Sequence, residues 1–178
     1  MSNIYIMEAA NLFVGDHDPK NSKFLTLEEL KLSDLQETLV DHTPGGGKVG
    51  VEFAVGVQKL EPTFKLKGWD APLLRDFGLG TTKRKVFTAY GIVRDKKTGD
   101  ALEAKAIMEG RLSKVAPEAF KRGETMGHDY SINEVLHYEV FFDGKEEFYW
   151  DFFTNTLRQG GVDPDPDFNN ILRISNGG

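Results

Sequence analysis

The amino-acid sequence predicts a mainly β protein, an antiparallel β-sandwich or barrel with one short packed α-helix. Three observations support this fold class. Apolar and polar residues alternate with period two along several segments. Short turn sequences join neighbouring segments of this kind. Signals for helix formation are few, so strands must supply most of the core.

The alternation is clearest in residues 48–55. One side of this segment carries Val49, Val51, Phe53 and Val55, and the other carries Lys48, Gly50, Glu52 and Ala54. This pattern predicts a strand with one buried face. Residues 62–68 follow the same rule, with Phe64 and Leu66 set against Lys65 and Lys67.

Two hairpins are expected further along the chain. The first joins residues 85–95 to residues 101–112 through the turn sequence DKKTGD. The second joins residues 131–142 to residues 145–153 through Asp143-Gly144, a dipeptide that accepts positive φ at low cost. Its second strand is rich in Phe, Tyr and Trp, which favours strand pairing.

One helix is predicted near residue 70. Asp70 is a suitable N-cap, Pro72 suits the first turn, and Gly78 is a suitable terminator. The apolar side of this helix would carry Leu73, Leu74 and Phe77. Residues 167–174 could form another helix after the DPDPD sequence.

Composition limits the class of function. The 178 residues suit one domain, residues 1–178, and no linker divides it. The 28 acidic residues outnumber the 22 basic residues, which argues against a stable nucleic-acid complex. With 0 cysteines there is no disulfide framework or thiolate metal site. We also expect no leader peptide and no transmembrane helix.

The segment HTPGGGKVGVEFAVG, residues 42–56, raises the question of a phosphate-binding loop. That motif needs a glycine five residues before its Gly-Lys pair, a Ser or Thr after the pair, and then a helix. Here those places hold His42 and Val49, and a period-two strand follows. The segment therefore indicates a glycine-rich connector between strands.

Other chemical motifs are also incomplete. Asp16 and Asp18 occupy two positions of a calcium loop that lacks its glycine and its closing glutamate. The aspartates of DPDPD are held apart by prolines. Glu103 and Glu109 lie six residues apart on one strand, about 20 Å and too far for a retaining-glycosidase pair. The four histidines are scattered, so we expect no enzyme, metal or cofactor.

The order of several landmarks resembles one protein family. One of these landmarks is a central motif that contains Gly110, Lys114, Pro117, Phe120, Lys121, Gly123 and Glu124. It is followed by the segment YEVFFDGKEEFYWDFFTNTLRQGGVDPDPDFNNIL and preceded by NLFVG, LTLEEL and a glycine-rich loop. These features together resemble the major tail tube proteins of contractile-tailed bacteriophages, the family that includes the inner tube of R-type pyocins.

The resemblance implies a structural subunit that assembles into a multi-subunit β-barrel ring. Hexameric rings of such subunits stack helically into the inner tail tube, a channel for DNA passage and membrane puncture. The implied partners are other copies of the chain, the tail sheath protein, the baseplate or tube initiator and the tail terminator. The tape measure protein and DNA would occupy the lumen transiently. The implied location is the virion tail, after synthesis in the host bacterial cytoplasm.

Two groups of residues are assigned to assembly on this basis. The tip of a long hairpin from about Leu27 to Val57 is expected to reach a neighbouring ring through His42, Thr43, Pro44, Gly45, Gly46, Gly47 and Lys48. Its glycines would keep the tip disordered until docking. Glu52, Lys65, Glu103 and Glu109 are the candidates for charged faces near the bore. A bore that is acidic overall would repel the phosphates of DNA.

Two alternatives stay open. A small-ligand-binding β-barrel of the lipocalin type would share the alternating strands, but it would be a stable monomer with an apolar cavity. A type VI secretion tube would share both the fold and the ring architecture. The central motif favours the phage or pyocin tube.

Overall fold

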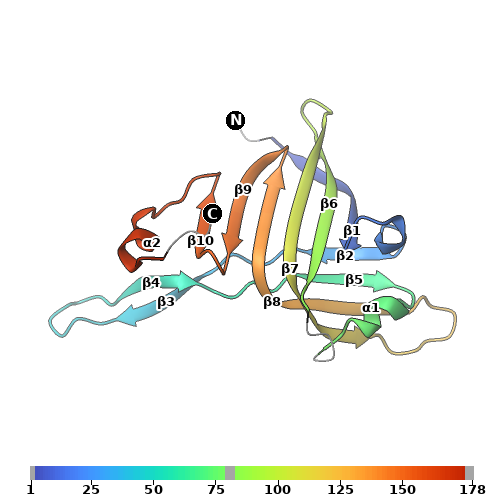
Figure 1. Cartoon of the computed structure of the whole chain (residues 1–178), viewed down its shortest axis with the longest axis horizontal. Helices are drawn as coiled ribbons and strands as arrows, with labels where there is room; N and C mark the ends of the chain where they lie inside the picture. The colour runs from blue at the N-terminus through green and yellow to red at the C-terminus, as the bar shows by residue number, and fades with distance from the viewer. Residues whose placement is uncertain (1–2, 79–82, 175–178) are drawn as a thin grey trace.

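The computed structural model describes residues 3–78 and 83–174 (Figure 1). These residues are mainly β, with antiparallel pairing throughout. The strands are β1 (Tyr5–Val14), β2 (Leu27–Lys31), β3 (Glu37–His42), β4 (Val51–Val57), β5 (Thr63–Lys67), β6 (Lys85–Asp95), β7 (Ala101–Pro117), β8 (Gly127–Phe142), β9 (Lys145–Asp151) and β10 (Thr156–Gln159). The helices are the 3-10 turn η1 (Pro19–Asn21), α1 (Ala71–Arg75) and α2 (Asp167–Leu172).

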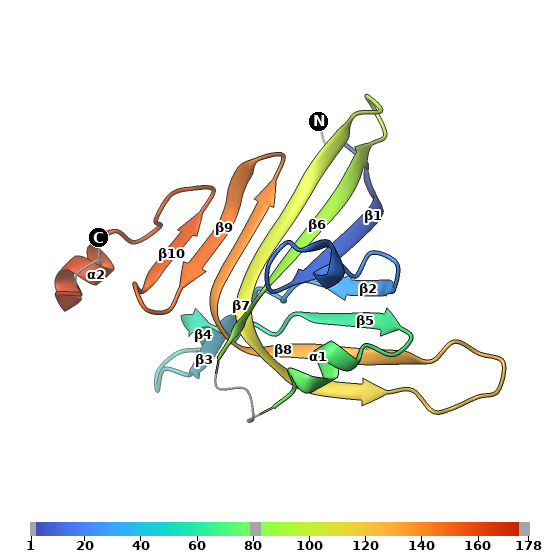
Figure 2. The same cartoon turned by 45° about the vertical axis from the view of Figure 1, so that its right-hand side comes forward.

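The long strands β7 and β8 connect two layers. The main sheet has the order β1-β6-β7-β8-β5-β2, and β9 and β10 continue from β8 on a separate branch. The first part of β8 pairs with β5, and its last part pairs with β9. Figures 1 and 2 show β7 and β8 bending, so that one layer holds β1, β6, β9 and β10 and the other holds β2 and β5.

The bend in β7 and β8 has a steric origin. Both strands shift register near Gly110, and Glu134 opposite has a φ of 49°. A Cβ at Gly110 would lie 2.8 Å from Ile132 Cγ2 and 2.9 Å from the Asn133 carbonyl oxygen. The close approach of the two strands at the bend therefore requires glycine, which gives a physical reason for the first residue of the motif.

The core lies between the two layers. Phe64 and Leu66 of β5 and Tyr130 of β8 are buried against Phe87 of β6 and Leu12 of β1. The rings of Phe64 and Tyr130 stack with centroids 4.9 Å apart. The predicted alternation of residues 62–68 is confirmed, since Lys65 and Lys67 point away from this core.

The sandwich description is supported, but the barrel is not. β1 and β2, at the two ends of the sheet order, approach each other without forming a ladder, so the described residues form no closed barrel. Both predicted hairpins are present, β6 with β7 and β8 with β9. The turn between β8 and β9 has φ of 49° at Asp143 and 73° at Gly144, as its dipeptide predicts.

The fold class with one short helix needs correction, because the described residues contain two α-helices, and the second lies where residues 167–174 were noted as a possible helix. α1 begins after Asp70, whose carboxylate accepts a hydrogen bond from the Leu73 backbone N–H at 3.0 Å. α2 follows the DPDPD sequence and is attached by Asn169, which exchanges side-chain and backbone hydrogen bonds with Asn155. Neither helix, nor any other in the described ranges, is long and apolar enough to cross a membrane.

The long hairpin is also longer than expected. It runs from β2 to β5 in two paired sections, β2 with β5 and then β3 with β4. The sequence predicted that the hairpin ends at Val57. In the structure it ends at Lys67, the last residue of β5, which pairs with β2. Only the first section belongs to the main sheet, and the second projects from the molecule (Figure 1).

Candidate assembly surfaces

Among residues 3–78 and 83–174, no helix or strand packs extensively against the β3–β4 section. Every residue of both strands is exposed, including Val51, Phe53 and Val55 at 46%, 56% and 63%. The prediction of a buried face along residues 49–55 is therefore wrong for the single chain. The physical reason is that no other described element covers either face of this section, so alternation produces an apolar side without a core beneath it.

The tip of this section, residues 42–48, is a turn. The Gly47 N–H donates to the Pro44 carbonyl oxygen at 3.0 Å. A Cβ at Gly47 would lie 2.3 Å from Pro44 Cγ, whereas one at Gly45 or Gly46 would meet no atom within 4 Å. Gly47 is thus required by the turn, and the other two glycines leave a small, open tip. The prediction that this tip orders on docking stays a prediction.

The central motif follows the end of β7 into the loop to β8. After Gly110 at the bend, Lys114 and Pro117 complete β7. Gly123 has a φ of 86° in a turn where the Glu124 N–H donates to the Lys121 carbonyl oxygen. Phe120 is 84% exposed at this tip. The motif therefore combines one residue that bends the sheet with residues that shape an exposed loop.

The four bore candidates do not share a face. Lys65 points outward from the layer of β2 and β5, where its Nζ lies 2.5 Å from Glu118 and 3.7 Å from Glu28. Glu103 and Glu109 point outward from the opposite layer, and Arg84 lies 3.6 Å from Glu109. Glu52 is exposed on β4. Their assignment to a bore stays a prediction, and one flat bore surface cannot contain all four.

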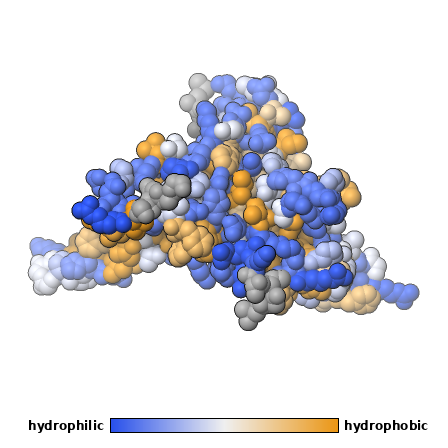
Figure 3. Space-filling model, in the orientation of Figure 1, coloured by the Kyte–Doolittle hydropathy of each residue, from blue (hydrophilic) through white to orange (hydrophobic). Residues whose placement is uncertain are grey.

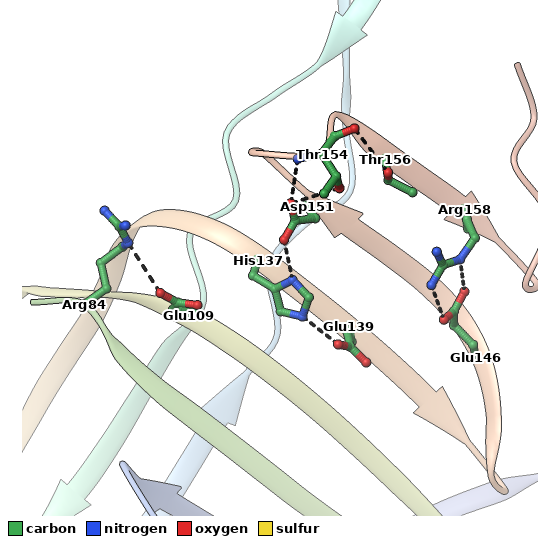
Figure 4. A network of polar contacts seen from close by, with 9 residues as sticks. All are labelled: Arg84, Glu109, His137, Glu139, Glu146, Asp151, Thr154, Thr156 and Arg158. Atoms are coloured by element: carbon green, nitrogen blue, oxygen red, sulfur yellow. Dashed lines mark hydrogen bonds and ion pairs between the residues drawn. The ribbon is translucent and has the colours of Figure 1, made fainter. Parts of the chain in front are cut away.

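A polar network covers the outer face of β8 and β9 (Figure 4). His137 Nδ1 lies 3.0 Å from Asp151 Oδ2, and its Nε2 lies 2.6 Å from Glu139 Oε1. A neutral imidazole has one N–H, so only the doubly protonated ring can donate to both carboxylates. Burial opposes that charge, but the hydrogen bonds to Asp151 and Glu139 outweigh it and raise the pKa of His137.

The carboxylate of Asp151 is held by the adjacent turn as well. Burial raises its pKa, but hydrogen bonds from Thr154 and His137 more than compensate, so the pKa of Asp151 is lowered. Nearby, Arg158 forms two hydrogen bonds of 2.9 Å with Glu146 and lies 3.7 Å from the centre of the Tyr149 ring. These contacts tie β8, β9 and β10 together across one face, and they have the geometry of structural ion pairs.

An apolar groove of about 1090 Å³ opens at the end of the molecule that carries α2. Its floor includes the buried Leu60, Val135 and Phe148 together with the half-buried Trp150 and Leu157, and Phe168 of α2 forms a wall. In Figure 3 apolar surface gathers beside α2 and along the β3–β4 section.

The sequence predictions missed this groove. Its residues come from β4, β8, β9, β10 and α2, so no local pattern reveals them. The signals that could have suggested it are the aromatic run FYWDFF and the phenylalanine after DPDPD, which together exceed what one strand and a short helix can bury. The described residues contain no group of three or more His, Cys, Asp or Glu side chains suited to hold a metal ion.

Comparisons with known proteins identify the family. The family described as phage tail tube protein FII matches residues 5–172. A solved structure of an extracellular contractile injection system, the PVC sheath-tube complex in the extended state, covers 75% of this chain and 89% of its own at 10% identity and a TM-score of 0.51. A chain in the solved structure of the anti-feeding prophage baseplate also matches, at 10% identity and a TM-score of 0.54. The match covers 79% of this chain and 97% of that chain. No curated protein matches the chain.

The described residues form an open β-sandwich from which an apolar hairpin projects. The chain belongs to the phage tail tube protein FII family, since the match covers nearly its whole length. This confirms the resemblance drawn from the order of the landmarks along the chain. The protein is an inner tail tube subunit, and its family is one of structural tube proteins.

Proposed function

We propose that the chain, as a single tail tube domain of residues 1–178, forms hexameric rings that stack helically into the inner tube of a contractile injection machine. The observation that carries this proposal is the exposure of the β3–β4 section. Both of its faces are exposed, and one of them is apolar. Isolated two-stranded hairpins are marginally stable in water. Pairing with strands of other copies would cover this section and close a multi-subunit barrel.

The layer of β2 and β5 is the better candidate for the bore wall. The β3–β4 section continues directly from these strands, so a barrel made by several copies would extend this layer. Lys65 and Glu52 belong to this hairpin, whereas Glu103 and Glu109 point outward from the other layer. We therefore keep Lys65 and Glu52 as bore candidates and place Glu103 and Glu109 on the outside of the tube.

The charges of the proposed bore wall suit passage of DNA or a tape measure protein without a stable complex. Lys65 is paired with Glu118 at 2.5 Å, and Lys67 with Glu28 at 3.1 Å. Lysines that already have a carboxylate partner attract phosphate groups weakly, because binding would require the ion pair to be broken. The net charge of −6 acts in the same direction.

Three partners follow for this subunit: a sheath protein around the tube, a baseplate or tube initiator at one end and a tail terminator at the other. The fold of this chain resembles that of proteins in a sheath-tube complex and in a baseplate. This shared fold is the support for the proposed partners. A type VI secretion tube would require the same ring, and the family match to phage tail tubes favours the phage or pyocin tube.

The lipocalin alternative would need a ligand cavity inside a closed barrel. In the described residues, side chains such as Phe64, Phe87 and Tyr130 fill the space between the layers.

Negative-stain electron microscopy of the concentrated purified protein tests the proposal. Hollow rings or tubes are the expected result, and their diameter and rotational symmetry can be measured directly by class averaging. Featureless monomers at every concentration and salt condition would contradict it. Adding a solution of short DNA to preformed tubes should leave the DNA free in a sedimentation assay.

Deleting Gly45–Gly47 tests the role of the hairpin tip. The deletion removes a surface turn that touches no core residue, so the monomer should keep its far-ultraviolet circular dichroism spectrum and its melting temperature. Polymerisation measured by light scattering should decrease. Gly46→Ala is the matched control, because a Cβ at that position meets no atom within 4 Å. Normal tubes from the deletion variant would exclude the tip from assembly.

A further inference from the structure

Two features at opposite ends of the molecule have complementary chemistry. One is the apolar groove beside α2, and the other is the exposed tip between β7 and β8, residues 118–124, called here the β7–β8 tip. Figure 1 shows the groove end with α2 and β10 on one side and the tip on the other. We infer that the β7–β8 tip of one copy inserts Phe120 into the apolar groove of the next copy.

The shape of the tip suits insertion. Phe120 is 84% exposed, so its side chain has almost no contact within its own chain. The loop that presents it is held by a turn at Lys121–Glu124 and by the Glu118 carboxylate, which accepts a hydrogen bond from the Gly127 N–H at 3.0 Å. A large aromatic side chain on a fixed loop loses little entropy on binding, which is the usual property of an interface anchor.

The groove offers what this anchor requires. Phe148 and Val135 are buried at its floor, and Trp150, Leu157 and Phe168 present aromatic and aliphatic surface around them. Its volume of about 1090 Å³ exceeds that of one phenylalanine ring, so adjacent residues of the tip can enter as well. In the single chain this apolar surface faces solvent, and burial against another apolar group would be favourable.

Charge decides which segment of a second copy is the occupant. The groove lining contains one basic residue, Lys59, which pairs with Glu61 at 2.8 Å. Its Asp163 and Asp165 have no ion-pair partner within residues 3–78 and 83–174, so they leave the border acidic. The β7–β8 tip has two acidic and two basic side chains, and Lys121 lies 3.8 Å from Glu124 while Glu118 is paired with Lys65. Arg122 therefore remains as the positive charge that can meet the acidic border. By contrast, the β3–β4 section carries more acidic than basic side chains, so the acidic border would repel it.

The positions of tip and groove give the contact a direction. Because they lie at different ends of the subunit, a copy that inserts its tip still presents an empty groove of its own. Such a head-to-tail contact repeats from copy to copy, as a tube requires. This inference rests on the proposed function, and it adds the pair of surfaces through which copies join.

Cross-linking tests the contact without relying on loss of assembly. The chain has 0 cysteines, so Phe120→Cys and Phe168→Cys can each be introduced as a unique thiol. The two variants, one of them affinity-tagged, are mixed under conditions where the wild-type protein forms tubes, and a short bis-maleimide is added. A cross-linked pair between tagged and untagged chains is expected. Leu25→Cys, which replaces a residue that is also 84% exposed, should give no such product with Phe168→Cys.

Assembly kinetics and charge reversal complete the test. Phe120→Ala should raise the critical concentration for assembly about 10-fold or more, which corresponds to about 1.4 kcal/mol per contact. Leu25→Ala should leave the critical concentration unchanged. Arg122→Glu should weaken assembly, because it places two acidic side chains across the contact. Adding Asp165→Lys in the same chain should restore assembly, because the contact then again joins opposite charges.

The outcomes separate this inference from the proposed function. Circular dichroism and melting temperature of Phe120→Ala should equal those of the wild type, since the side chain is exposed. Wild-type tubes combined with no specific cross-link and an unchanged critical concentration for Phe120→Ala would overturn the inference alone. Absence of rings and tubes from the wild-type protein would instead contradict the proposed function.

Discussion

Strands β4 and β5 follow the same alternating pattern, but the apolar side is exposed in β4 and buried in β5. In β5, Phe64 and Leu66 are 3% and 0% exposed, because the layer of β1 and β6 covers them. In β4, Phe53 and Val55 are 56% and 63% exposed, because no described element lies over them. Both strands lie on the same long hairpin, separated by only five residues.

This difference shows that alternation predicts a strand with one apolar side, but it does not predict what covers that side. In β5 the cover is the chain itself. In β4 we propose that it is another copy of the chain. On this proposal the same sequence pattern serves folding in one section of the hairpin and assembly in the next, and substitutions can separate the two roles.

The largest expected effect is on the covered section. Phe64→Ala removes a ring that stacks on Tyr130 with centroids 4.9 Å apart and lies 6.2 Å from Phe87. The cavity and the lost contacts should reduce the free energy of unfolding by about 3–5 kcal/mol. The measurement is chemical denaturation of the monomer. A loss below about 1 kcal/mol would show that the two layers do not depend on this ring.

The bend between the two layers should be the next most sensitive position. Gly110→Ala places a Cβ 2.9 Å from the Asn133 carbonyl oxygen and 2.8 Å from Ile132 Cγ2. Backbone must shift to accept it, at a cost of about 1–3 kcal/mol. Thermal unfolding measures this loss, with Gly46→Ala as the control that meets no atom within 4 Å. Equal melting temperatures for the two variants would remove the steric explanation of the bend.

Local features of the fold could be predicted from the sequence because their causes are local. The turn at Asp143-Gly144 places its own strands, and Asp70 caps its own helix. Alternation likewise identified the inward residues of β5. Each of these signals depends on residues within a few positions, where dihedral preferences and hydrogen bonds act directly.

Features that depend on several elements could not be predicted. Lys65 and Glu109 were grouped together, but the bend at Gly110 directs their strands to opposite layers. The groove between α2 and β9 needs side chains from strands that are far apart in the sequence. The occupant that we propose for it belongs to a second molecule. Register shifts and layer changes of this kind follow from tertiary packing, which no window of the sequence contains.

A smaller effect is expected in the polar network, and it should depend on pH. His137 donates to Asp151 and Glu139, with Glu109 opposite on β7. Its pKa is raised in the folded state, so its stabilisation is fully present below its ordinary pKa near 6.5 and is lost as pH rises through the folded value. The lowered pKa of Asp151 acts in a more acidic range, since its contribution is lost only as pH falls through its folded value.

His137→Gln tests this network, because glutamine can donate a hydrogen bond but cannot become charged. The variant should lose about 1 kcal/mol relative to the wild type at pH 5.5 or so, and the difference should shrink toward pH 9 or so. Unfolding midpoints measured across this range give the comparison. A difference that stays constant with pH would show that the neutral ring makes the same contribution as the charged one.

The smallest effect on the monomer, and the sharpest contrast with Phe64→Ala, belongs to the uncovered section. Phe53→Ala removes an identical side chain from the same long hairpin, but the ring is 56% exposed and its described ring contact is a tilted one with His42 at 5.9 Å. The free energy of unfolding of the monomer should change by less than about 0.5 kcal/mol. Assembly should nevertheless require a higher protein concentration, because the apolar side of β4 would bury less surface against the next copy. If Phe53→Ala destabilised the monomer as much as Phe64→Ala, β4 would have a cover within its own chain, and the division of the hairpin into a folding section and an assembly section would fail.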